Sequence, residues 1–362
     1  MDHAGRQTRL QSVLKHDHLD ALLVTHLPNV RYLSGFTGSA GVLLLGNGKS
    51  GLFTDGRYTD QARAEVDGAR VVVGRKPALV AAGEWLNANG KRVGIKALGI
   101  EALHMTVAER GQLQKVLRSG PRLRDAPPLI ERARMVKDKE EIECLRAAVR
   151  LGSSLFEVAL RMIRPGTREI EVAAEMEYEA RRAGAEGMSF ETIIASGPRS
   201  ALPHGRALAA EIPANGFVVC DFGIILAGYC SDMTRTVHVG EPTGDERSMY
   251  EAVREAQQAA MDRVRPGVSG GEVDRAARKV LTARGLGKYF THSTGHGVGL
   301  QIHEAPRVAK GQPERLSSGM VITIEPGVYV PGVGGVRIED MVVVTDQGCE
   351  VLTPTSKELI II

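Results

Sequence analysis

Four carboxylates and one imidazole in the C-terminal half of the chain have the types and spacing of metal ligands. Asp221 and Asp232 form one acidic pair and Glu325 and Glu339 form a second, with His296 between the pairs. Burying this many carboxylates without a cation would cost several kcal/mol for each. The apolar runs around them argue against exposure to water. The sequence therefore predicts that the five side chains bind metal together.

Ligands that are mostly oxygen suit a pair of divalent cations. Four carboxylates roughly offset the charge of two dications, and carboxylates can bridge two ions. A single imidazole among oxygens favours manganese, cobalt or iron and admits zinc, but it fits a structural zinc site poorly. Two such cations about 4 Å apart can activate a water and polarise a carbonyl, so the expected chemistry is hydrolysis.

Each acidic pair lies in apolar, β-branched segments, which predict strands. Residues 216–220 precede Asp221, and residues 319–324 precede Glu325. The glycines within 332–335 predict a hairpin turn between the two strands of the second pair. Two strand pairs are therefore expected to present carboxylates to one site.

Histidines near these strands could contact substrate or move protons. His292 and His296 have the spacing of a helical zinc motif, but the glycines around His296 disfavour a helix. His204 and His303 could donate hydrogen bonds to a developing oxyanion or act as proton shuttles. His296 is the predicted ligand, and His204 and His303 are candidate catalytic residues.

The segment that carries the acidic strands repeats itself. The turns 164–166 and 265–267 both read Arg-Pro-Gly, and each precedes a helical pattern that ends near a glycine, Gly184 or Gly285. The two copies keep the same offset at the turn and at the helix, and each is followed by one acidic strand pair. We therefore expect two similar halves that meet face to face and each supply two carboxylates. A repeat of this length does not indicate a solenoid, which needs at least three short units.

The N-terminal part alternates short strands with helices, which predicts a small α/β domain. The predicted strands are 21–25, 41–45, 50–54 and 70–73, and the predicted helices lie near 7–17 and 57–66. The pattern breaks at 125–129, which indicates a linker. The predicted domains are therefore 1–127 and 128–362, and the second begins with a long helix from about residue 138 to 163.

Composition is that of an ordinary globular protein, since the 362 residues are 43% hydrophobic and 25% charged, with a net charge of +3. This small charge gives no argument for a nucleic-acid or membrane partner. The four cysteines form no CxxC motif and favour a reducing compartment. The charged N-terminus does not resemble a secretory signal, and no apolar run reaches the roughly 18 residues that span a bilayer. A cytoplasmic location is therefore expected.

The five predicted ligands resemble those of the dinuclear "pita-bread" metallopeptidases, the family of creatinase, aminopeptidase P, prolidase and methionine aminopeptidase. Residues from about 130 onward resemble the pita-bread domain, and the motifs at 29–39 and 54–62 resemble the N-terminal domain of the proline-specific members. Methionine aminopeptidases lack that domain. Creatinase has it but does not keep the metal ligands, all of which are present here.

The resemblance implies a role for each ligand. Asp221 would bind one metal, and His296 with Glu325 would bind the other. Asp232 and Glu339 would bridge the two ions. Glu325 would also accept the proton of the attacking water. The implied cofactor is a pair of divalent metal ions, with manganese first and cobalt, iron or zinc as alternatives.

Further residues are implied to act on the substrate. His204, His292 and His303 resemble the histidines of the family that contact substrate and move protons. Arg337 could orient the carboxylates from behind. The N-terminal domain would narrow the entrance to the site and favour short peptides. A homodimer is the family expectation.

The expected fold is an α/β N-terminal domain followed by an α+β pita-bread catalytic domain with an internal pseudo-two-fold repeat. The expected activity is that of an Xaa-Pro aminopeptidase, which removes the first residue from short peptides with proline at the second position. The alternative is an Xaa-Pro dipeptidase, or prolidase, which needs a basic group such as Arg206 or Arg337 to hold the free carboxylate of the substrate. A non-catalytic binding module is a third alternative, which the complete ligand set disfavours.

Overall fold

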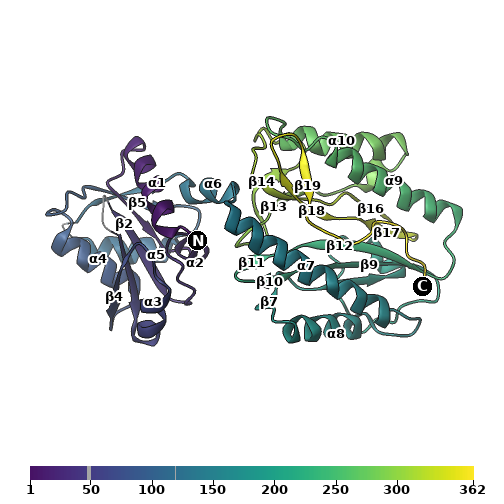
Figure 1. Ribbon diagram of the computed structural model, residues 1–362, viewed down its shortest axis with the longest axis horizontal. Coiled ribbons are helices and arrows are strands. Elements are labelled where there is room, and N and C mark those ends of the chain that lie inside the picture. The colour runs from purple at the N-terminus through teal and green to yellow at the C-terminus, as the bar shows by residue number, and fades with distance from the viewer. Residues whose placement is uncertain (47–49, 119) are drawn as a thin grey trace. The chain divides into compact units, whose positions relative to one another are not determined.

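The computed structural model describes residues 1–46, 50–118 and 120–362, which form two compact units, Met1–Arg134 and Met135–Ile362 (Figure 1). Helix α6 (Leu129–Met135) lies where the units divide. Its residues Glu131 and Arg134 hydrogen-bond to Asn29 of the first unit. The predicted boundary after residue 127 thus falls just before a helix whose side chains contact the first unit.

The first unit is an α/β domain built on a six-stranded mixed sheet with the strand order β4-β3-β2-β1-β5-β6. Its strands are β1 (Ala21–Val24), β2 (Gly41–Gly46), β3 (Ser50–Asp55), β4 (Arg70–Gly74), β5 (Ala97–Glu101) and β6 (Arg122–Ala126). Its other helices are α1 (His3–His16), α2 (Leu27–Ser34), η1 (Gly56–Tyr58), α3 (Thr59–Glu65), α4 (Ala78–Asn89) and α5 (Val107–Val116). The four predicted strands and both predicted helices are confirmed, because each combines a clear apolar pattern with turn residues at its ends.

The second unit holds four long helices around several small antiparallel sheets. The helices are α7 (Lys139–Met162), α8 (Glu169–Arg182), α9 (Gly244–Met261) and α10 (Gly270–Ala283), with 3-10 turns η2 (Gly197–Ala201) and η3 (Gly287–Tyr289). The strands of the first half are β7 (Gly187–Met188), β8 (Ile193–Ser196), β9 (Gly216–Phe222), β10 (Ile224–Leu226), β11 (Tyr229–Cys230) and β12 (Met233–Val239). Those of the second half are β13 (Gly295–Gly297), β14 (Glu304–Val308), β15 (Val321–Ile324), β16 (Gly327–Val330), β17 (Gly334–Arg337), β18 (Asp340–Val344) and β19 (Cys349–Val351).

The helices begin where the sequence places capping groups. The side chain of Asp138 accepts the backbone N–H of Glu141 at the start of α7, and Glu141 reaches back to the backbone of Asp138. Ser269 and Glu272 form the same reciprocal cap at the start of α10. Such caps satisfy N–H groups that have no partner inside the helix. The long predicted helix and both helices of the repeat are therefore confirmed.

The internal repeat is visible in how the helices and strands pack. Helices α7 and α8 bury their apolar faces with β8, β9 and β12 in one core, and α9 and α10 pack with β15, β17 and β18 in another. Figure 1 shows the strands lying between the two helix pairs. The halves are joined where β12 meets the segment 337–339, since the backbone N–H of Glu339 donates to the carbonyl of Thr234 at 3.1 Å. Among the described residues, no helix is long and apolar enough to cross a membrane.

Candidate metal centre

The five predicted ligands gather at strand ends where the two halves meet. Asp221 lies in β9, and Asp232 directly precedes β12. Glu325 directly follows β15, Glu339 lies between β17 and β18, and His296 lies in β13. All five line one open cavity of about 850 Å³. The sequence is therefore right that the two acidic pairs converge, although most of the acids end strands rather than lie inside them.

Three of these residues already have the spacing of a metal site. Asp232, His296 and Glu339 each offer a ligand atom, and these atoms lie within 4.8 Å of one another. Nε2 of His296 is 3.6 Å from Oδ2 of Asp232 and 3.5 Å from Oε1 of Glu325. Asp221 faces the same cavity and is not part of the tight group of three.

The imidazole of His296 is held in the form that binds metal. Its Nδ1–H donates to the carbonyl of Gly297 at 3.0 Å, which leaves a lone pair on Nε2. Burial lowers the pKa of His296 to about 4, so the ring is neutral at physiological pH. A neutral imidazole whose acceptor nitrogen faces carboxylate oxygens would be repelled by them, and a cation between them removes that conflict.

The carboxylates also fit a cation pair. Burial, with the charges of neighbouring acids added, raises the pKa of Asp232 and of Glu339 well above the usual range. Burial raises the pKa of Glu325 to about 8. Within the described parts of the chain, Oδ1 of Asp221 and Oε1 of Glu339 are buried oxygens that accept no hydrogen bond. Two divalent ions would offset the negative charge and supply partners for both oxygens.

Two threonines orient the ligands. The hydroxyl of Thr234 donates to Oε2 of Glu339 at 2.7 Å. The hydroxyl of Thr323 accepts the backbone N–H of His296 at 3.1 Å and donates to Oε1 of Glu325 at 3.4 Å. Sequence reasoning missed both. Each threonine stands two positions from a ligand, so the two-residue period of a strand could have placed them on the same face.

Arg337 is buried behind the ligands, and each of its nitrogens donates a hydrogen bond. Nε donates to the hydroxyl of Thr234 at 3.1 Å, and Nη2 donates to Oδ2 of Asp221 at 2.5 Å. Nη1 donates to the carbonyl of Pro203 at 3.1 Å and to the hydroxyl of Tyr329 at 2.5 Å. This geometry suits orientation of a ligand. It disfavours the hypothesis that Arg337 holds the carboxylate of a substrate, because the four bonds leave at most one N–H group, too few for a two-pronged contact with a carboxylate.

His292 takes part in the same network. Its Nδ1–H donates to the carbonyl of Ser293 at 2.8 Å, so Nε2 accepts from the hydroxyl of Tyr329 at 2.9 Å. Burial, reinforced by the charge of Arg337, lowers the pKa of His292 to about 4. Burial raises the pKa of Tyr329 to about 12, so this hydroxyl keeps its proton. Tyr329 was missed because nothing local distinguishes it from other strand residues.

The other two candidate histidines also lie in the cavity. His204 follows the 3-10 turn η2 and lines the cavity wall. The ring of His303 packs edge-on against His296, with centroids 4.4 Å apart and planes at 74°. Burial lowers the pKa of His303. The structure thus brings every predicted ligand and catalytic histidine to one cavity.

Two further arginines line this cavity. Arg206 forms an ion pair with Glu191 at 2.9 Å, and both side chains are largely exposed. Arg307, on β14, lies close enough for its charge to add to the lowering of the pKa of His303, which burial dominates. In the described ranges, no hydrogen bond or ion pair engages the Arg307 guanidinium. Arg307 was missed by the sequence reasoning and is the cation most available to an anionic group in the cavity.

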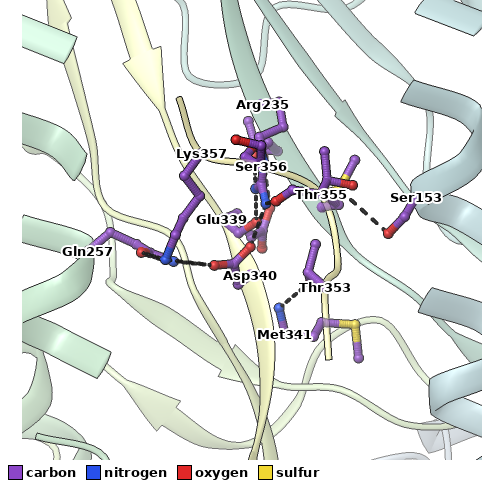
Figure 2. Close-up of polar contacts among 12 residues, drawn as sticks. Ser153, Arg235, Gln257, Glu339, Asp340, Met341, Thr353, Thr355, Ser356 and Lys357 are labelled. Atoms are coloured by element: carbon purple, nitrogen blue, oxygen red, sulfur yellow. Dashed lines mark hydrogen bonds and ion pairs between the residues drawn. The ribbon is translucent and has the colours of Figure 1, made fainter. Parts of the chain in front are cut away.

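A second buried polar network lies behind Glu339 (Figure 2). Arg235 donates to Oδ1 of Asp340 at 2.7 Å and to the carbonyl of Glu339 at 2.6 Å. Oδ2 of Asp340 accepts from Gln257 at 2.8 Å and pairs with Lys357 at 3.3 Å. Arg235 and Asp340 are almost fully buried. The network therefore anchors the backbone of a predicted bridging ligand to α9 and to the C-terminal segment.

Comparison with protein families identifies both units. The chain matches the model of metallopeptidase family M24 over residues 143–346 and the Creatinase/Prolidase N-terminal domain over residues 6–136. An Xaa-Pro dipeptidase from Pyrococcus horikoshii is 39% identical over 344 residues, which cover 94% of this chain and 95% of the relative.

Solved structures resemble the chain over its full length. An Xaa-Pro dipeptidase from Bacillus anthracis matches with a TM-score of 0.95 and 40% identity over 100% of both chains. An X-Pro aminopeptidase from Thermotoga maritima matches with a TM-score of 0.90 and 34% identity over 99% of this chain and 100% of the other. The expected fold class is confirmed. For activity, the dipeptidases among the relatives favour the alternative that the sequence left open.

Proposed function

The chain belongs to metallopeptidase family M24 and carries a Creatinase/Prolidase N-terminal domain, and from this premise we propose that it is an Xaa-Pro dipeptidase. Its substrates would be dipeptides with proline at the second position. The relatives named as Xaa-Pro dipeptidases support this choice. The cavity adds a structural argument, because a dipeptide carries a free carboxylate next to the scissile bond and needs a nearby cation.

The proposal rests on the position of Arg307. It lines the cavity that holds the metal ligands, and its guanidinium has no partner among the described side chains. A planar guanidinium can bind a carboxylate with two parallel hydrogen bonds. Arg206 is a weaker candidate because it is already paired with Glu191 at the rim. Arg337 is also a weaker candidate, because its four hydrogen bonds inside the protein leave too few N–H groups to bind a carboxylate with two parallel bonds.

The residues of the cavity would have different roles in hydrolysis. Asp221, Asp232, His296, Glu325 and Glu339 would hold two divalent ions, manganese first, and these ions would activate water and polarise the scissile carbonyl. Glu325 would accept the proton of the attacking water. His204 and His303 would donate hydrogen bonds to the carbonyl oxygen as it becomes negative.

His292 would act differently from the other histidines, because both of its ring nitrogens already have partners. It would hold the Tyr329 hydroxyl in place, and through it Arg337. Proline at the second position suits this cavity, because the scissile amide then has no N–H and requires no acceptor for one. A homodimer and a cytoplasmic location remain predictions.

The competing activity is that of an Xaa-Pro aminopeptidase, which the similarity to the Thermotoga maritima enzyme favours. Turnover of Xaa-Pro compared with Xaa-Pro-Yaa, by the manganese-loaded full chain, separates the two. We expect hydrolysis of the dipeptide and little or none of the tripeptide. Preference for the tripeptide would make the chain an aminopeptidase. Hydrolysis of neither peptide, with metal bound, would leave only a binding module.

A further inference from the structure

Each half of the catalytic unit contains a buried acid paired with an arginine, outside the set of metal ligands. The acids are Glu169 on α8 and Asp274 on α10, the two helices of the repeat. Their side chains are 0% and 1% exposed, and the partner arginines, Arg199 and Arg278, are each 28% exposed. Burying a charge is costly unless the charge is paired and hydrogen-bonded. The further hydrogen bonds of these pairs therefore indicate which segments they position.

Glu169 holds both ends of the first loop, which we define as residues 196–208. Oε1 of Glu169 accepts from the backbone N–H and the hydroxyl of Ser196, both at 2.8 Å. Oε2 accepts from the backbone N–H of Leu208 at 3.3 Å. One carboxylate therefore closes a loop that contains His204, which lines the cavity.

Arg199 adds a third attachment within the same loop. Its Nε donates to Glu169 at 3.1 Å, and its Nη2 donates to the carbonyl of Arg206 at 2.7 Å. Arg199 thus links the Glu169 carboxylate to the backbone at Arg206, which lies beyond His204 in the loop. Hydrogen bonds that involve a charged group are about twice as strong as neutral ones, and burial of the Glu169 carboxylate removes competing water at that end.

Asp274 and Arg278 make an equivalent arrangement for the second loop, residues 290–294. Oδ1 of Asp274 accepts from the hydroxyl of Thr294 at 2.8 Å. Arg278 donates through Nε to Oδ2 of Asp274 at 2.7 Å and through Nη2 to the carbonyl of His292 at 2.6 Å. The guanidinium also lies 4.2 Å from the ring centroid of Phe290.

The two loops meet at one guanidinium. Nη1 of Arg337 donates to the carbonyl of Pro203 in the first loop. It also donates to the hydroxyl of Tyr329, which in turn donates to His292 in the second loop. Each loop is therefore held on its outer side by an acid–arginine pair and on its inner side by Arg337.

We propose that Glu169–Arg199 and Asp274–Arg278 are two positioning pairs that hold the histidine-bearing loops of the two halves against Arg337. In this arrangement His204 keeps its place in the cavity wall, and His292 keeps Tyr329 on Arg337. None of the four residues touches a reacting group. The inference rests on the proposed peptidase function, because loop position affects activity only if a peptide is bound and cleaved in this cavity.

The variants Glu169→Gln and Asp274→Asn test the proposal. Each amide keeps the shape of the acid but must turn an NH₂ group toward a donor, which breaks one attachment. The two variants serve as controls for each other, since each should loosen only its own loop. Glu177→Gln, an exposed acid also on α8, is the neutral control. Backbone amide hydrogen exchange, manganese affinity and kcat/KM for Xaa-Pro are measured on the full chain.

We expect faster exchange in 196–208 for Glu169→Gln and in 290–294 for Asp274→Asn, with the other loop unchanged in each variant. We expect kcat/KM to fall roughly tenfold in both, which corresponds to loss of one charge-assisted hydrogen bond. Manganese affinity should match that of the wild type. Wild-type exchange in both loops would overturn the proposal, as would a loss of manganese affinity that accounts for the loss of activity.

Two further variants keep the test decisive if an amide variant does not fold. Arg199→Lys and Arg278→Lys retain the charge but cannot bind the acid and the loop carbonyl together, because an ammonium lacks the planar fork. The same loop-specific exchange should appear. Its absence from both would overturn the proposal. Exchange is read without substrate, so a wild type that cleaves no proline peptide would refute the proposed function and leave the exchange result valid.

Discussion

The guanidinium of Arg337 donates to Oδ2 of Asp221 at 2.5 Å and joins β17 of the second half to β9 of the first. Their side chains are 4% and 13% exposed, respectively. In the described parts of the chain, this is the only side chain that hydrogen-bonds to Asp221. One predicted ligand of the metal centre therefore depends on a residue from the opposite half for its orientation.

Replacement of Arg337 should impair the metal centre. In Arg337→Lys the positive charge remains, but an ammonium cannot reach Thr234, Tyr329 and Asp221 together. We expect kcat/KM to fall roughly a hundredfold, since a small misplacement of a site group has effects of this size. Manganese binding, measured by calorimetry, should weaken at one of two sites. Arg206→Lys, at the rim, is the matched control, and equal losses in both variants would contradict the assignment.

Arg307 should determine preference for a free carboxylate. In Arg307→Met the side chain keeps much of its length but loses the cation that would bind the C-terminal carboxylate of a dipeptide. We expect KM for Xaa-Pro to rise roughly ten- to a hundredfold, the effect of a lost charge-assisted contact. Hydrolysis of the corresponding Xaa-Pro amide, which has no carboxylate, should be unchanged. A variant that loses both activities equally would show that Arg307 has another role.

Removal of metal should reverse the pH dependence of stability. Glu325 has a pKa raised to about 8 from an ordinary value of 4.5, so its favourable protonated state is lost as pH rises toward 8. His292 and His296 have a pKa lowered to about 4, and they oppose this trend only below 6.5, where unfolded histidine binds protons. Between pH 6.5 and 8 the metal-free protein should therefore lose stability.

Thermal unfolding with a chelator and with excess manganese checks this prediction. With manganese the Tm should not fall over the same window, because deprotonated ligands bind the ion more tightly. The variant Glu325→Gln, without metal, should show a flatter pH dependence than the wild type. A metal-free Tm that rises from pH 6.5 to 8 would contradict the predicted protonation of the buried acids.

The Asp340–Arg235 pair should contribute strongly to stability. Asp340→Ala leaves a buried guanidinium without its acid and also removes the acceptor for Gln257 and Lys357. We expect a loss of about 4 kcal/mol in the free energy of unfolding, as for other broken buried pairs. Denaturant unfolding measures it. The exposed pair of Arg254 and Glu251 provides the control, because Glu251→Ala should cost less than about 1 kcal/mol.

Much of the site could be predicted because its chemistry is concentrated in a few local patterns. Asp221 and Glu325 each follow an apolar run. A carboxylate buried in that position is costly unless a cation or hydrogen-bond donor pairs with it. The repeat then predicted that the two acidic pairs belong to one site. The glycines beside His296 correctly disfavoured a helix, since the structure has a short strand there.

Residues whose roles depend on partners far away in the sequence could not be predicted in the same way. Tyr329 matters because its hydroxyl lies between His292 and Arg337, and its own neighbours in sequence give no indication of this. The sequence does not distinguish Arg307 from the other arginines, whereas the structure places it in the lining of the cavity. The proposed preference for a dipeptide likewise rests on one cation in the cavity, which composition and motif spacing do not reveal.

The division of ligands between the halves has a consequence for how the protein matures. A nascent chain that has emerged only through α9 possesses Asp221 and Asp232 but none of the residues that complete the ligand set. Two carboxylates alone bind divalent ions weakly, so tight loading must await synthesis and docking of the later strands. With the proposed ligand set, uptake of metal would therefore be a late event in biogenesis, and a loaded centre would indicate that the whole catalytic unit has assembled.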